Sequence, residues 1–274
     1  GHNGTSITSI AALENIFTSL NGQNWNWTEI AEGVEDYKAP GVPWNFTKSS
    51  ADGSYLHDPC DPIGAGLWCY CGSGPCIIEA LFLGSQTVTV IGTLPPSLGD
   101  IEGIEAYFFQ SRGITGSIPK EVAKATALLY LDTFGSNVGG PIPNELGDLK
   151  ELTDLHLGGG GIGSGTIPES LGNLPYLTLF APGVGYHGTF PESFCNASNL
   201  AEIYMGNNQY TGTIHECLGN LQNLQYLDFS NTLMTGTIPA SLGKLQNLQF
   251  LDFSDTLMTG TIPASLGKLQ NCYI

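Results

Sequence analysis

The residues able to support acid–base, nucleophilic or metal chemistry are spread thinly along the chain. Its five histidines lie far apart in the sequence, at His2, His57, His156, His187 and His215. The sequence contains no G-x-S-x-G nucleophile elbow, no H-E-x-x-H zinc motif and no phosphate-binding glycine loop. We therefore predict a protein that is not an enzyme and that uses neither a cofactor nor a metal.

One pair of carboxylates has a spacing that could bring the two groups close enough for acid–base chemistry or metal binding. Asp228 and Asp252 are 24 residues apart, and if their strands stack as neighbours they lie about 5 Å apart. Such a pair could act as acid and base or hold Ca²⁺. An exposed Asp in a stacked column more often only solvates the sheet, and we predict that role here.

The elements that position these residues follow from one repeated phrase, which reads Gly-Thr-Ile-Pro in its clearest form. Successive copies are separated by 24, 24, 25, 23, 24, 24 and 24 residues. This regularity in a glycine-rich chain indicates a repeat protein. The copies begin at Gly92, Gly116, Gly140, Gly165, Gly188, Gly212, Gly236 and Gly260.

Each repeat carries the apolar pattern L-x-x-L-x-L, which at a period of 20–29 residues is typical of one short strand and one helical turn per coil. Strand alternation directs Leu251 and Phe253 inward and Asp252 outward. A single coil cannot bury its apolar edge, so stacked coils must share one core.

The phrase L-T-G-x-I-P-x-x-L-G-x-L resembles the plant-type extracellular leucine-rich repeats of receptor ectodomains, polygalacturonase inhibitors and secreted algal and protist proteins. The resemblance covers roughly Ile77 to the end of the chain. It implies an α/β repeat fold: a right-handed solenoid with a parallel sheet on the concave face and short 3-10 or helical turns on the other. It also implies a second short sheet at the T-G-x-I-P segments.

The chain departs from that family at the position that usually holds a ladder-forming Asn. Only Asn208 keeps the amide, and serine or threonine hydroxyls can replace part of the ladder whereas glycine cannot. The glycine run at 158–161 and the 25/23 spacing around it therefore predict an irregular coil. The column reads Arg112, Ser136, Gly160, Gly185, Asn208, Thr232 and Thr256.

Residues 1–76 do not repeat and resemble the helical, disulfide-stapled N-terminal cap of this family, which covers the open end of the first coil. A helical stripe with a Thr5 or Ser6 cap is expected from Ile7, Ile10, Ala11, Leu13, Ile16, Phe17 and Leu20. The predicted domains are this cap at 1–76 and a solenoid of about eight coils at 77–274.

The seven cysteines point to disulfides. The four cysteines of the predicted cap allow three disulfide pairings, and the sequence does not choose among them. Zinc binding by these cysteines is the alternative, although disulfides suit an extracellular chain better. These four are Cys60, Cys69, Cys71 and Cys76.

Two further cysteines and one odd cysteine fall within the repeats. Cys195 and Cys217 are 22 residues apart against a 24-residue period, which places them side by side in neighbouring coils and predicts a disulfide. Cys272 takes the inward position that Leu248 holds one coil earlier. The sequence stops within a coil and no C-terminal cap is visible. Either the natural chain continues, or self-association through this end and Cys272 covers it.

Composition and sequons agree with a secreted protein. Eight Lys and Arg against 25 Asp and Glu give a net charge of −17, which argues against nucleic acid and anionic membrane surfaces as partners. No apolar run reaches the ~20 residues needed to span a bilayer. Predicted N-glycosylation sites are Asn3, Asn26, Asn45 and Asn196.

The outward positions of the main strands form the predicted binding surface. Interleaved aromatic and acidic side chains there suit a protein, a peptide or a glycan, although some of the rings could simply cover the sheet. The predicted ligand-binding residues are Phe82, Phe108, Tyr130, Asp132, Asp154, His156, Glu202, Tyr204, Tyr226, Asp228, Phe250 and Asp252.

A second regular surface is the ladder formed by Thr211, Thr213, Thr235, Thr237, Thr259 and Thr261. In an extended T-G-T segment both hydroxyls would point the same way, and the array resembles the ice-binding faces of some antifreeze solenoids. The T-G-x-I-P motif that is common in this family also explains the threonines, and Pro141 interrupts the ladder.

We predict extracellular recognition or adhesion through the sheet face. The alternatives are a structural subunit of an extracellular fibre or larger assembly, and ice binding.

Overall fold

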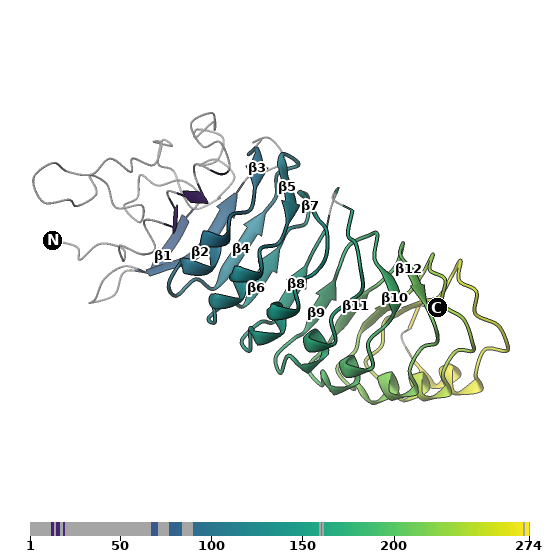
Figure 1. Ribbon diagram of the computed structural model, residues 1–274. Helices are drawn as coiled ribbons and strands as arrows, with labels where there is room; N and C mark the ends of the chain where they lie inside the picture. The colour runs from purple at the N-terminus through teal and green to yellow at the C-terminus, as the bar shows by residue number, and fades with distance from the viewer. Residues whose placement is uncertain are drawn as a thin grey trace, which may run out of the picture.

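The computed structural model describes residues 12–13, 15–16, 19, 67–70, 77–83, 90–158, 160, 162–270 and 272–273 of the chain. Within them the coils stack side by side into a rod, with the chain passing once around per repeat (Figure 1). The predicted leucine-rich repeat solenoid is confirmed. Outside the described residues lie Cys60, Cys71, Cys76, Asn3, Asn26 and Asn45, together with the side chain of Cys69.

The main sheet runs the length of the rod, and its strands follow one another in the order β1-β2-β4-β6-β8-β9-β11-β13-β14. All neighbours are parallel except β1, which pairs antiparallel with β2 and so extends the sheet into the region predicted as cap. The strands are β1 (Leu67–Tyr70), β2 (Ile77–Leu83), β4 (Ala106–Phe109), β6 (Tyr130–Asp132), β8 (Asp154–His156), β9 (Leu179–Ala181), β11 (Glu202–Tyr204), β13 (Tyr226–Asp228) and β14 (Phe250–Asp252).

The implied second sheet is present in two pieces. One piece contains β3 (Gly92–Thr93), β5 (Ile114–Ser117) and β7 (Asn137–Gly139), and the other contains β10 (His187–Thr189) and β12 (Gln209–Thr211). Between them, the coil with the glycine run contributes only an isolated bridge from Gly163 to Gly140. The irregular coil predicted from the spacing is therefore confirmed.

In the part of the chain that the structure describes, eight 3-10 turns lie across the core from the main sheet (Figure 1). The proline of the repeat phrase precedes most turns in extended conformation; Pro239, for example, has φ −63° and accepts the Leu242 N–H at 3.2 Å. The turns are η2 (Pro96–Asp100), η3 (Lys120–Lys124), η4 (Asn144–Asp148), η5 (Glu169–Asn173), η6 (Glu192–Asn196), η7 (Glu216–Asn220), η8 (Ala240–Lys244) and η9 (Ala264–Lys268).

Successive turns approach most closely at a glycine. A Cβ added at Gly219 would lie 2.5 Å from both the carbonyl carbon and the Cβ of Ser241 in the next turn. Gly243 meets Ser265 in the same way. At Gly219 and Gly243 the second residue of the next turn therefore leaves no room for a side chain, whereas the same position holds Ala123 in η3 and Cys195 in η6.

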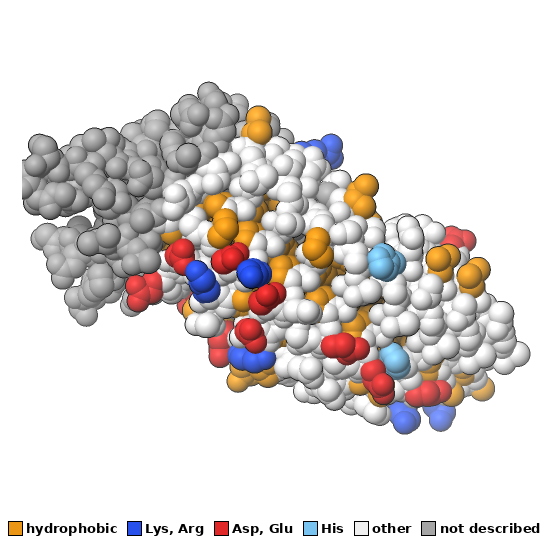
Figure 2. All heavy atoms as spheres, viewed as in Figure 1, with side chains coloured by type: hydrophobic (Ala, Val, Ile, Leu, Met, Phe, Trp, Pro, Cys, Tyr) orange, Lys and Arg blue, Asp and Glu red, His pale blue; other side chains and the backbone are white. Residues whose placement is uncertain are grey.

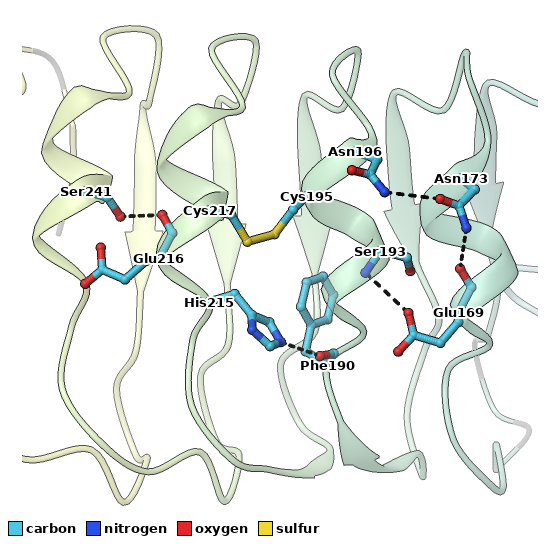
Figure 3. The surroundings of a disulfide bond; sticks show 10 residues. All are labelled: Glu169, Asn173, Phe190, Ser193, Cys195, Asn196, His215, Glu216, Cys217 and Ser241. Carbon is cyan, nitrogen blue, oxygen red and sulfur yellow. Dashed lines mark hydrogen bonds between the residues drawn. A yellow bond between two sulfur atoms is a disulfide. The ribbon is translucent and has the colours of Figure 1, made fainter.

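The predicted disulfide between Cys195 and Cys217 is confirmed, with a Cα–Cα distance of 5.6 Å. Cys195 is the fourth residue of η6 and Cys217 is the second residue of η7 (Figure 3). The cross-link thus replaces the glycine–serine contact found between other turns. Asn196, next to it, is exposed and donates from Nδ2 to Asn173 Oδ1 at 3.2 Å.

The core is one continuous apolar cluster that extends from Leu13 and Ile16 to Leu266. Residues 12, 13, 15, 16 and 19 are helical, and Ala12, Leu13 and Ile16 are buried. Leu13 and Ile16 of the predicted apolar stripe therefore pack on the core. The other members of the stripe and the predicted Thr5 or Ser6 cap lie outside the described residues, at Ile7, Ile10, Ala11, Phe17 and Leu20. Whether the domain boundary lies at residue 76 stays a prediction.

The ladder position that usually holds Asn is filled in several ways. Asn208 Oδ1 accepts the Tyr186 N–H at 2.9 Å, and its Nδ2 donates to Gly183 O at 2.7 Å, so it bridges two coils. At the N-terminal end the predicted column is wrong by one residue: Arg112 is exposed. Buried Ser111 takes its place, accepting the Val90 N–H at 2.8 Å and donating to Val90 O at 3.0 Å.

Candidate binding face

The outward side chains of the main sheet line up in two columns, as predicted. In the first column Tyr130 pairs with Asp154, and Tyr226 pairs with Phe250. In the second, Phe82 pairs with Phe108, and Asp228 with Asp252. We call this surface the sheet face, and it is defined by the predicted ligand-binding residues, all of which lie on it. Whether they bind a ligand stays a prediction.

Aromatic rings form two stacks on the sheet face. Towards the N-terminal end Phe82 and Phe108 stack with ring centroids 4.7 Å apart, and Tyr130 follows at 6.5 Å. Because the rings cover one another's faces, they expose mainly edges, which suits apolar protein side chains better than the flat face of a sugar ring.

The second stack lies towards the C-terminal end. Tyr204, Tyr226 and Phe250 follow one another at 6.1 Å, and Tyr273 continues the stack at 6.2 Å. Tyr273 was missing from the predicted set, although its distance of 23 residues from Phe250 is close to one repeat. The stacks leave the middle of the sheet face open between them.

The Asp side chains of the sheet face accept hydrogen bonds from the backbone in addition to contacting solvent. This corrects the purely solvating role predicted for Asp228 and Asp252. Each accepts the backbone N–H two residues ahead: Asp228 from Ser230 at 2.8 Å and Asp252 from Ser254 at 2.7 Å. Asp132 does the same with Phe134, at 2.6 Å. These carboxylates fix the chain where it leaves each strand.

Asp132 also lies near a histidine. Its Oδ1 is 3.9 Å from His156 Nδ1. Partial burial raises the pKa of Asp132, while the Phe134 N–H and the neighbouring His156 act in the opposite direction. Among the described residues no group of three or more His, Cys, Asp or Glu is arranged to hold a metal.

In the described residues, basic side chains lie away from the main strands, whereas acidic side chains lie on both sides of the rod. The main strands from β2 onward carry no Lys or Arg, whereas Asp132, Asp154, Glu202, Asp228 and Asp252 lie on them. Figure 2 shows basic side chains over the side that carries the turns, mixed with acidic ones. The lysines of the solenoid lie in or beside these turns, at Lys120, Lys124, Lys150, Lys244 and Lys268. The sheet face therefore presents aromatic and acidic groups without local cations other than histidine.

A groove of about 570 Å³ crosses the open middle of the sheet face. It forms there because β9 and the following segment carry small residues, including Ala181 and Gly183, between larger neighbours. Sequence reasoning missed the loop residues on its wall, since their positions depend on the irregular spacing. The groove is lined by Phe134, His156, Leu157, Leu179, Ala181, Gly183, Val184, Glu202, Tyr204, Gly206, Asn207 and Asp228.

The threonine ladder is exposed throughout, but its geometry differs from the prediction of an extended backbone. Gly236 has φ +81° and Gly260 has φ +91°, in the left-handed region that favours glycine. The threonine before the glycine turns its hydroxyl back to the preceding coil, as when Thr235 donates to Gly212 O at 3.0 Å. The threonine after it places its methyl against the glycine of the next coil, so that Thr213 packs under Gly236.

The column after the glycine is also longer than the predicted ladder. Exposed threonines occupy it without interruption over the last five coils, at Thr166, Thr189, Thr213, Thr237 and Thr261. In Figure 2 the surface over β10, β12 and the coils that follow is mostly uncharged, with hydrophobic side chains at its edge. We call this surface the threonine face.

Comparisons with known proteins agree with this architecture. The family model described as Leucine Rich Repeat matches residues 223–245 and 247–269. Receptor-like protein 41 of Arabidopsis thaliana is 31% identical over 137 residues, which is 49% of this chain and 15% of that protein. The chain therefore has the leucine-rich repeat solenoid fold, and its match spans less than a sixth of this relative's length.

Two solved structures share the fold. One is the ectodomain of the Arabidopsis receptor kinase HAESA in complex with an N-terminally extended IDA peptide hormone ligand. Its TM-score is 0.70 at 24% identity, over 96% of this chain and 40% of that one. The other is a plant ice-binding protein, with a TM-score of 0.61 at 22% identity, over 95% of this chain and 90% of that one. In the described part of the chain, no helix is long and apolar enough to cross a membrane.

Proposed function

We propose that this chain is a non-enzymatic recognition module that binds a peptide or an extended loop of a protein partner along its sheet face. The observation that carries the proposal is the groove between two aromatic stacks, on a side of the rod whose strands bear acids and no Lys or Arg. Central aromatic residues contribute most of the affinity in many interfaces. The HAESA ectodomain, which shares the fold, is in complex with a peptide hormone.

We also propose that the protein is extracellular. The disulfide between Cys195 and Cys217 suits an oxidising compartment. Asn196 is exposed on the turn side, where a glycan would leave both the sheet face and the threonine face free. Self-association through Cys272 gains no support from its surroundings, because the thiol packs against the core and burial raises its pKa.

Selection from a displayed peptide library on the intact protein tests the recognition function. We expect peptides that bind the wild-type protein to lose at least about tenfold in affinity on a Tyr226→Ala/Phe250→Ala variant, because two stacked rings are removed. An Asn220→Ala variant on the turn side is the control and should bind normally. Failure to enrich any peptide, or equal binding to both variants, would contradict the proposal.

Ice binding is a second candidate, favoured by the unbroken column of exposed threonines from Thr166 to Thr261. Coils repeat about 4.8 Å apart, and the methyl groups of Thr166, Thr189, Thr213 and Thr237 each lie against a glycine of the next coil. A flat, uncharged array with a fixed period suits a periodic solid surface. The plant ice-binding protein that shares this fold is similar over nearly its whole length.

An ice-recrystallisation assay tests this second candidate. A Thr213→Lys/Thr237→Lys variant should lose at least about tenfold in inhibitory activity, because two long charged side chains would interrupt the flat array. Asn220→Lys is the matched control, since the equivalent position one turn later is already Lys244. An inactive wild-type protein, or an active double variant, would end this candidate and leave peptide recognition unaffected.

A further inference from the structure

The second column of the sheet face contains one gap. On successive strands from β6 to β13 it holds Asp132, His156, Ala181, Tyr204 and Asp228. Ala181 offers only a methyl group and is itself buried, so it forms the floor of the groove between His156 and Tyr204. Their strands are two inter-strand steps apart, roughly 9.6 Å.

Rings form both walls of this gap. His156 stacks on Phe134 with ring centroids 4.7 Å apart, and Tyr204 stacks on Tyr226 at 6.1 Å. Each wall is therefore held by a second ring behind it. A planar group in van der Waals contact with both walls needs about 7–8 Å, so the gap has the width for one flat side chain.

Acidic groups stand beside the gap. Glu202 and Asp228 line the groove, and no Lys or Arg does. The Tyr204 hydroxyl donates to Glu202 Oε2 at 2.8 Å, and Asp228 Oδ1 accepts the Ser230 N–H at 2.8 Å. Each contact orients a carboxylate whose oxygens retain lone pairs for further donors. A matching group is flat, positively charged and rich in N–H donors.

We propose that the position above Ala181, between His156 and Tyr204, is a slot for an arginine side chain of the partner. The inference rests on the proposed peptide recognition and adds the chemistry of one contact. A guanidinium stacks on the Tyr204 ring and directs paired N–H donors at Glu202 or Asp228. A lysine ammonium is compact and cannot fill a flat slot. A neutral aromatic ring would offer no N–H donor to the remaining lone pairs of either carboxylate.

Three small probes separate these properties. The N-acetyl methylamides of arginine, lysine and citrulline are titrated into the intact protein and followed by NMR. Citrulline keeps the planar shape without the charge, and lysine keeps the charge without the plane. We expect the arginine probe to bind about fivefold to tenfold more tightly than either of the others. Equal binding of the three probes would overturn the inference.

Substitutions in the slot provide the second measurement. Ala181→Leu, which fills the gap, and Glu202→Gln, which removes the charge, should each weaken binding of the arginine probe by at least about fivefold. Glu216→Gln is the control, because Glu216 is an exposed carboxylate on η7, on the turn side, and does not line the groove. Circular dichroism verifies that each variant is folded. Unchanged binding by folded Ala181→Leu would also overturn the inference.

The outcome remains separable from that of the proposed function. Library peptides that depend on Tyr226 and Phe250 but lack arginine would refute the slot and leave peptide recognition in place. If the peptides do not depend on the sheet face at all, both proposals fail.

Discussion

Replacing Gly219 with Ala is expected to lower the free energy of unfolding by about 3 kcal/mol, because a single added methyl group overpacks the contact between two turns. The new Cβ would lie 2.5 Å from the Cβ and carbonyl carbon of Ser241. Those atoms belong to or adjoin the backbone of the next coil and cannot move aside as a flexible side chain would. Urea unfolding followed by circular dichroism measures the change.

Gly267→Ala is the matched control for this prediction. Gly267 holds the same place in η9, and an added Cβ there would have no atom within 4 Å. Neither glycine has a positive φ, so alanine introduces no backbone strain at either position. Equal stabilities of the two variants would show that the close approach of turns does not require glycine.

Replacing Asn208 with Ala is expected to lower the free energy of unfolding by about 3 kcal/mol, because buried polar groups lose their hydrogen-bond partners. The amide accepts the Tyr186 N–H from the preceding coil and donates to Gly183, Met205 and Gly206 carbonyl oxygens. Tyr186 would retain a backbone donor without its acceptor. Denaturant unfolding at fixed pH measures this loss.

A Thr232→Ala variant distinguishes the stability contributed by hydrogen bonds between coils from that contributed by hydrogen bonds within one coil. Thr232 takes the equivalent buried position, but its hydroxyl donates only to Phe229 O in its own coil, at 2.7 Å. Removing this hydroxyl should lower the free energy of unfolding by about 1 kcal/mol. The loss in an Asn208→Thr variant should lie between those of Thr232→Ala and Asn208→Ala. A Thr232→Ala loss as large as that of Asn208→Ala would assign the stability to local bonds instead.

Most of the fold was predictable because a 24-residue period and strand alternation leave only one register that buries the leucines. The same argument placed Tyr226 beside Phe250 and Cys195 beside Cys217, and both placements are observed. In each case a position within the repeat is sufficient to locate a side chain. The candidate sheet face was predicted on that ground alone.

What escaped prediction depends on local departures from the repeat. The groove needs Ala181 on β9 and loop residues such as Phe134 and Val184, and no column of the repeat contains all of these. The shift from Arg112 to Ser111 likewise arises within one coil. The left-handed glycines of the threonine face had a visible signal, since glycine occurs in every copy of the repeated phrase.

Cys195 and Cys217 occupy the positions that glycine and serine hold at other contacts between turns, and this has a mechanical consequence. Most boundaries between coils are held by apolar packing and hydrogen bonds, which yield gradually when the rod is pulled along its axis. The boundary between η6 and η7 also contains a covalent bond. Under tension the two coils it joins would stay together after their neighbours had separated. Reduction would make this boundary as weak as the rest, so the redox state of the surroundings decides whether these two coils separate when their neighbours do.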